Sequence, residues 1–222
     1  MDEKLVNKLV SYCKDNLELT QPAPRGYESA PICALDSVFS LGIKYATVEN
    51  VLNLFLLHFN LTVDTKITTS EVLSIIDPFS AEELSVILQN NNRTDTHKNS
   101  LLKTAAYKQF LEVMREHGVE TREDIVNAVN NQDFKDDIMA IRGQTQGTSL
   151  DYLFILARVD NYVKYDRHVQ RFVQNGTELE NVGKAQGVRL VREAAKVLSE
   201  TDYPGMTARH LDHIIWSWQM QQ

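Results

Sequence analysis

The sequence predicts an all-α protein, on three observations. First, apolar residues recur at helical spacing: Leu211, Ile214 and Trp218 fall at positions i, i+3 and i+7, so they share one face of a helix that begins after Thr207. Second, no convincing run of alternating β-branched residues occurs, and the best strand candidate, 61–63, is too short. Third, only 9 Gly and 5 Pro punctuate the 222 residues. We expect roughly ten short helices in one compact unit.

Helix starts are marked by polar residues that cap helices. Thr68 with Glu71, and Ser80 with Glu83, have the spacing of a capping box, in which each side chain accepts the backbone N–H of the other residue. Each pair stands directly before an apolar run. Thr121, which is followed by acidic residues and an apolar segment, predicts a further helix start.

Polar stretches rich in Gly, Pro or Asn predict the connections between helices. They are residues 21–31, 90–100, 174–177 and 202–205. None of them is long enough to link two independent domains. We therefore expect residues 1–222 to form a single unit, with its N- and C-terminal helices packed together as one lobe.

The composition is that of an ordinary globular protein, with 43% hydrophobic and 24% charged residues. Two cysteines, Cys13 and Cys33, cannot provide a four-thiolate zinc or iron–sulfur site. They also do not suggest the disulfide framework of a secreted protein. The N-terminus lacks an apolar signal segment, and the apolar run 51–59 is too short to cross a bilayer. We expect a cytoplasmic protein, neither secreted nor membrane-bound, and nucleoid-associated if the source is bacterial.

The formal net charge of −7 limits the kinds of partner the protein can have. A protein that coats polyanions without specificity would be basic. The charge does not exclude a nucleic-acid enzyme with one local contact patch.

The most informative segment is a glycine-containing turn between two predicted helices at residues 136–158. Its glycines permit positive φ and close backbone approach, and it aims free N–H groups of the second helix outward. Such groups at a helix N-terminus suit a DNA phosphate, and these contacts do not read sequence. The alternative to DNA binding is that the turn only packs the two helices together, as glycine-containing turns between helices commonly do. The expected contact residues are Gly143, Gln144, Thr145, Gln146, Gly147 and Thr148.

Asp166 stands directly before an amphipathic segment that begins with Arg167 and His168. The simplest interpretation is that Asp166 caps a helix. A carboxylate at this position is also favoured by the helix dipole, and it can stabilise a positively charged sugar transition state or orient water against one. One residue can do both.

Four elements follow one another in this sequence: a hairpin, an apolar helix, a loop, and an Asp-x-His sequence at a helix start. This order resembles the helix-hairpin-helix DNA glycosylases, the superfamily of endonuclease III and 3-methyladenine glycosylase. The family hairpin reads roughly L-P-G-V-G-x-x-T-A. Gly143 matches its first glycine and Thr148 its threonine, while Asp166 and His168 match the Asp-x-His. Weaker similarity extends to residues 35–42, 99–110 and 209–218.

The resemblance implies a fold of two helical lobes with a cleft between them. It implies a monomeric DNA glycosylase that binds double-stranded DNA, flips out a damaged or modified base and hydrolyses its N-glycosidic bond, with Asp166 as the catalytic carboxylate. Arg167 and His168 are expected to contact backbone phosphates. The family's bifunctional members carry a lysine nucleophile where this chain has Gly147, so the resemblance implies no lyase step. No metal or iron–sulfur cluster is expected, although the hairpin could bind a monovalent cation.

Two other functions remain open. The hairpin departs from the family pattern, with Arg142 in place of the proline and Thr145 in place of the second glycine. These changes and the acidic charge favour a catalytically silent DNA-binding protein of the same fold. The acidic charge also fits an all-helical protein-interaction domain.

Overall fold

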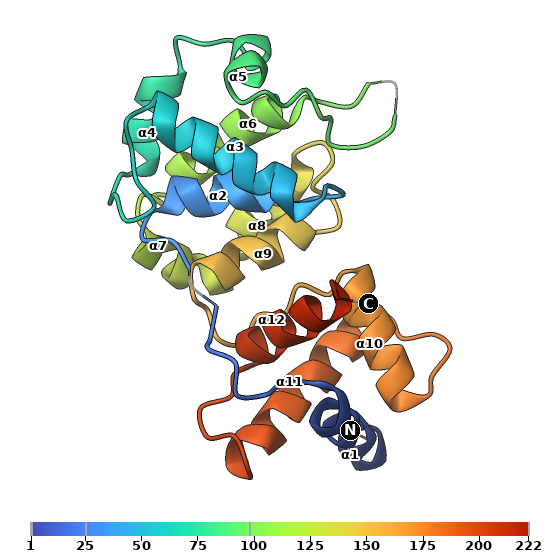
Figure 1. Ribbon diagram of the computed structural model, residues 1–222. Coiled ribbons are helices and arrows are strands. Elements are labelled where there is room, and N and C mark those ends of the chain that lie inside the picture. Colours follow the sequence, from blue (N-terminus) through green and yellow to red (C-terminus); the bar gives the residue numbers. More distant parts are fainter. Residues whose placement is uncertain (1, 25, 98, 222) are drawn as a thin grey trace. The chain divides into compact units, whose positions relative to one another are not determined.

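The chain is all-helical in the computed structural model, which describes residues 2–24, 26–97 and 99–221 (Figure 1). The helices are α1 (Glu3–Asn16), α2 (Ala30–Phe39), α3 (Tyr45–His58), α4 (Thr69–Ile76), α5 (Ala81–Ile87), α6 (Lys103–Glu116), α7 (Arg122–Asn127), the 3-10 helix η1 (Ala128–Asn130), α8 (Gln132–Ala140), α9 (Thr148–Leu156), α10 (Arg167–Thr177), α11 (Lys184–Glu200) and α12 (Ala208–Gln219). Within the described residues there is no strand, only an isolated antiparallel bridge between Arg93 and Leu102. The all-α prediction is confirmed.

The chain divides into two compact units. Unit 1 combines Met1–Arg25 with Arg158–Gln222, and unit 2 is Gly26–Ala157. In the part of the chain that is described, no helix is both long enough and apolar enough to span a bilayer.

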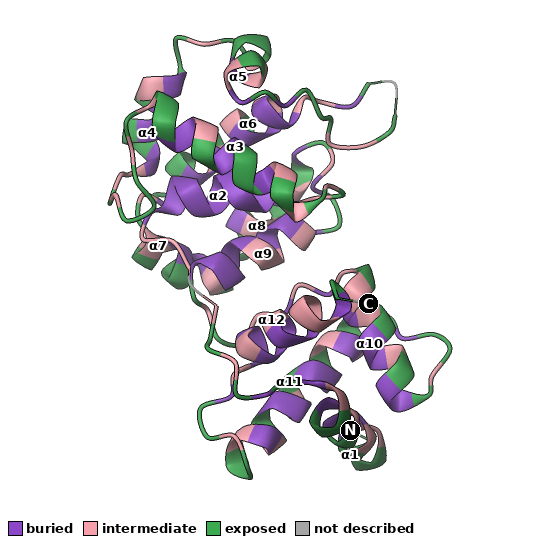
Figure 2. Cartoon of the chain, viewed as in Figure 1, coloured by how far each residue is buried: buried purple, intermediate pink, exposed green. Residues whose placement is uncertain are grey.

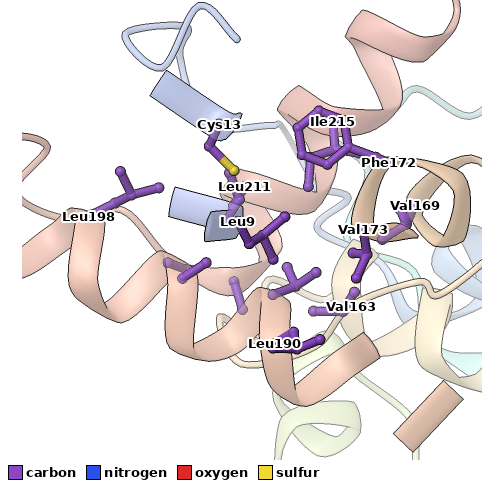
Figure 3. Packing of buried hydrophobic residues seen from close by; sticks show 14 of the residues in the cluster. Leu9, Cys13, Val163, Val169, Phe172, Val173, Leu190, Leu198, Leu211 and Ile215 are labelled. Atoms are coloured by element: carbon purple, nitrogen blue, oxygen red, sulfur yellow. The ribbon is translucent and has the colours of Figure 1, made fainter. Parts of the chain in front are cut away.

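Unit 1 has a core of its own, built from both ends of the sequence. Helix α1 packs against α10 and α11, and α12 packs against the same two helices. Figure 3 shows Leu9 and Cys13 of α1 among the apolar side chains of α10, α11 and α12. Burial raises the pKa of the Cys13 thiol to about 12, so this cysteine is held as an unreactive thiol within the core.

Unit 2 is organised around α2, all of whose residues are buried (Figure 2). Helices α3, α4, α6, α7 and α9 pack against it. Its one buried acid, Asp36, accepts hydrogen bonds from the hydroxyls of Tyr27 (2.8 Å) and Ser40 (2.7 Å). At the C-terminal end of α2, the buried Lys103 ammonium donates to the carbonyls of Phe39 (2.9 Å) and Leu41 (2.5 Å), where the helix dipole favours a cation.

The predicted helix starts are confirmed. Complete capping boxes are present at Thr68 with Glu71, at Ser80 with Glu83, and at Thr121, whose partner is Asp124. The Glu71 carboxyl accepts hydrogen bonds from the Thr68 backbone N–H, which has the larger effect, and from the Thr68 hydroxyl. Both lower the pKa of the Glu71 carboxyl. The predicted cap at Thr207 is also confirmed.

Two predicted connections have different boundaries in the structure. Residues 174–177 form the last turn of α10, and the chain leaves the helix at Glu178, which has φ 59°. Gly176 is helical there and packs closely against α1, where an added Cβ would lie 2.9 Å from side-chain atoms of Leu9 and Tyr12. The loop predicted at 21–31 ends earlier, because α2 begins at Ala30 and Pro31 stands in its first turn. Arg25 and Lys98, within the loops predicted at 21–31 and 90–100, lie outside the described residues.

Candidate functional site

Asp166 caps the N-terminus of α10, as predicted. Its Oδ1 accepts the backbone N–H groups of His168 (2.8 Å) and Val169 (3.2 Å). Its own N–H donates to the carbonyl of Lys164 at 2.7 Å, which makes a tight turn just before the helix. The carboxylate therefore has a fixed direction relative to the helix axis.

The second carboxylate oxygen of Asp166 is left for another partner. The residue is half-buried, and its Oδ2 has no hydrogen-bond partner among residues 2–24, 26–97 and 99–221. Two N–H groups thus hold one oxygen while the other can meet water or a ligand. A carboxylate held in this way can accept a further hydrogen bond from water or a ligand.

Arg167 and His168 share the first turn of α10 with Asp166. Arg167 is exposed, and its Nε donates to Nε2 of His168 at 3.4 Å. The other ring nitrogen of His168, Nδ1, is buried and has no hydrogen-bond partner among the described residues. Arg171 is exposed one turn further along the helix, at i+4 from Arg167.

Tyr165, directly before Asp166, anchors this turn to α11. Its ring lies over Gly187, and its hydroxyl donates to the Val182 carbonyl at 3.3 Å. The same carbonyl accepts a hydrogen bond from the side-chain amide nitrogen of Gln170 at 3.3 Å. Burial raises the pKa of Tyr165 to about 12.

The predicted hairpin joins α8 to α9 in unit 2. The Gln144 N–H donates to the Ile141 carbonyl and the Gly147 N–H to the Gln144 carbonyl, each at 2.9 Å. Gly143 and Gly147 have φ of 86° and 66°, so the expected need for positive φ is confirmed at both. Gly143 also packs closely on Thr94, because an added Cβ would lie 2.3 Å from the Thr94 Cβ.

The predicted contact residues of the hairpin differ in exposure. Thr145 and Gln146 are exposed at its tip, and Thr148 is half-buried. Gln144 is only 2% exposed, and its side-chain carbonyl accepts the Ser149 hydroxyl. The Gln144 side chain therefore packs inside the hairpin, and its expected contact with DNA would have to be made by its backbone. Gly147 is buried as well.

The N-terminus of α9 has unpaired donors. Its N-cap residue is Gly147, which has no side chain to cap the helix, and the N–H groups of Thr148, Ser149 and Leu150 have no acceptor in the described part of the chain. The side-chain nitrogen of Gln144 is also without a partner there, but it is buried. Ser149 and Leu150 are buried as well, so the half-buried Thr148 carries the N–H that an anion could reach.

Formal charge is distributed unevenly between the units. Unit 1, which contains Asp166, has 13 Lys and Arg against 12 Asp and Glu. Unit 2, which contains the hairpin, has 10 against 18. An anion at the hairpin would therefore be bound by backbone N–H groups rather than by a basic surface.

Residues 7–220 match the model of a family described as Domain of unknown function (DUF8548). The chain belongs to this family. No curated protein and no solved structure matched it. The range of the DUF8548 match includes both the hairpin and the Asp166 turn.

Two residues that pack against the hairpin and the Asp166 turn were missed by sequence reasoning. Thr94, which packs on Gly143, lies within a segment that predicts only a surface loop. Gly187, which packs under Tyr165, lies inside α11, where a glycine is costly unless packing requires it. The mid-helix glycine is the signal that could have found the second of these residues.

Proposed function

We propose that this chain is a monofunctional DNA glycosylase of the base-excision-repair type, with Asp166 as its catalytic carboxylate. The observation that supports this most is the geometry of that side chain. Two backbone N–H groups hold Oδ1, and Oδ2 has no hydrogen-bond partner among the described residues. The proposed fold is that of the helix-hairpin-helix glycosylases, in which the α8–α9 hairpin is the DNA-binding element.

The proposed reaction begins when a damaged or modified nucleotide leaves the base stack, which costs a few kcal/mol and is easiest for a damaged or mispaired base. The bond between C1′ and the base nitrogen then breaks, and the base leaves with the bonding electrons. Asp166 opposes the positive charge on the sugar and directs a water molecule to C1′. The water loses one proton, the departing base gains one, and the products are a free base and an abasic site.

The hairpin and the first turn of α10 would hold the DNA backbone. The unpaired N–H group of the half-buried Thr148 is a donor for one phosphate, a contact that does not read sequence. The exposed Arg167, together with His168, would contact a second phosphate beside Asp166. Gly147 offers no amine, so we expect no Schiff-base intermediate and no strand cleavage.

A protein-interaction domain is the second candidate, and the charge of unit 2 favours it. That unit has 18 acidic against 10 basic residues, so its net charge is unfavourable for binding a polyanion. It also exposes the large apolar side chains of Leu57 and Val86.

A gel-shift measurement with a duplex that contains an abasic-site analogue separates these candidates. We expect the protein to retard the duplex, and the affinity to fall as salt rises from about 50 to about 200 mM. Thr145→Glu, which places a carboxylate at the exposed hairpin tip, should abolish retardation. Ser74→Glu adds the same charge at an exposed position of α4 and should not.

The absence of retardation at low salt would contradict both the glycosylase and the catalytically silent DNA-binding protein. Equal loss of binding in the two variants would show that the hairpin is not the contact.

A further inference from the structure

The turn that presents Asp166 is set by a close contact between two helices of unit 1. Helix α11 has a glycine, Gly187, in its second turn, and the Tyr165 ring lies against it. A Cβ added to Gly187 would lie 2.0 Å from Cζ, 2.1 Å from Cε2 and 2.3 Å from the hydroxyl oxygen of Tyr165. No real side chain fits at such distances, so only glycine leaves room for this ring.

The Tyr165 ring cannot easily move aside. It is 9% exposed and belongs to the apolar core of unit 1. Its hydroxyl donates to the Val182 carbonyl, to which Gln170 of α10 also donates. A side chain at position 187 would therefore push the ring, and with it the backbone that leads into α10.

Asp166 is the next residue after Tyr165, and it has little freedom of its own. Its Oδ1 accepts the N–H groups of His168 and Val169. A displacement of Tyr165 is thus passed through one peptide bond to Asp166, whose carboxylate is tied to the first turn of α10 by the two hydrogen bonds.

We propose that Gly187 is a positioning residue for Asp166: by lacking a Cβ it admits the Tyr165 ring, which fixes where the carboxylate of the proposed glycosylase lies. This inference rests on the proposed function for its consequence in catalysis. The contact itself can be tested whether or not the protein releases a base.

The test is Gly187→Ala, with Gly183→Ala as the matched control. Gly183 is the exposed N-cap of the same helix, its φ is −70°, and nothing lies within 4 Å of an added Cβ. In two-dimensional NMR spectra, we expect the backbone N–H signals of His168 and Val169 to shift in Gly187→Ala and to stay at their wild-type positions in Gly183→Ala. The turnover rate of base release should fall by about 100-fold in Gly187→Ala, as expected for a misplaced catalytic group, while the affinity for the abasic-analogue duplex changes less than about threefold.

Unchanged His168 and Val169 signals in Gly187→Ala would overturn the inference. If those signals shift but the wild-type protein releases no base, the proposed function fails and the positioning contact stands. Should Gly187→Ala not fold, Tyr165→Phe keeps the ring and removes the Val182 hydrogen bond. Hydrogen exchange at His168 and Val169 should then be faster than in the wild type, and an unchanged rate would equally overturn the inference.

Discussion

Replacement of Asp166 with Asn is expected to remove base release while leaving the fold intact. Asn caps a helix about as well as Asp, so the hydrogen bonds to His168 and Val169 can be kept. We expect the free energy of unfolding to change by less than about 0.5 kcal/mol. The loss of the negative charge should lower the rate of base release by about 10³-fold, which lies within the usual range for removing a catalytic acid or base.

The matched control for this variant is Asp2→Asn. Asp2 caps α1 in the same way, accepting the Lys4 N–H at 3.1 Å, and it is exposed. It should change neither the stability nor the rate of base release. If Asp166→Asn releases the base of an accepted substrate at the wild-type rate, the catalytic assignment is eliminated. If Asp166→Asn unfolds and Asp2→Asn does not, the charge of the Asp166 carboxylate is needed for the structure.

Gly143→Ala is expected to have the second large effect, on both unit 2 and DNA binding. An alanine there would have to adopt φ 86° and would meet Thr94, whose Cβ lies 2.3 Å from the added Cβ. Positive φ alone costs of order 1 kcal/mol for a non-glycine residue, and the steric conflict should add roughly 1–3 kcal/mol. The hairpin should also deform, so affinity for the abasic-analogue duplex should fall.

Gly118→Ala separates the two costs. Gly118 has φ 69°, but nothing lies within 4 Å of an added Cβ, so the variant incurs only the backbone cost. Urea denaturation followed by circular dichroism reports the stability of both units. Fluorescence of Trp216 and Trp218 reports unit 1 alone, because the chain has no other tryptophan. Equal loss of stability in the two variants, with DNA binding retained in both, would show that the Thr94 contact and the hairpin shape do not matter.

Local chemistry made much of the structure predictable. The capping boxes at Thr68 and Ser80, and the cap at Asp166, depend on residues three or fewer positions apart, so the sequence contains all the information that they need. The positive φ of Gly143 and Gly147 was predictable for the same reason, because only glycine adopts it without strain.

Features that depend on how side chains pack in the folded protein were not predictable. Gln144 looks like an exposed turn residue, but the packing of the hairpin buries it against Ser149. Gly176 looks like a turn glycine, but it is helical and packs closely against α1. The Tyr165 contact joins elements 22 residues apart, and a single sequence does not show which residue a mid-helix glycine such as Gly187 accommodates.

A base-release screen of the wild-type protein tests the central claim most directly. The substrates are duplexes that each contain one damaged, alkylated or otherwise modified base. The products to be measured are the free base and the strand from which the base was removed. We predict release of a free base from at least one duplex, with the strand left whole until alkali cuts it at the abasic site, and no covalent protein–DNA adduct after borohydride treatment. Failure to release a base from any duplex, by protein that still retards the abasic-analogue duplex, would contradict the glycosylase assignment and leave a silent DNA-binding protein.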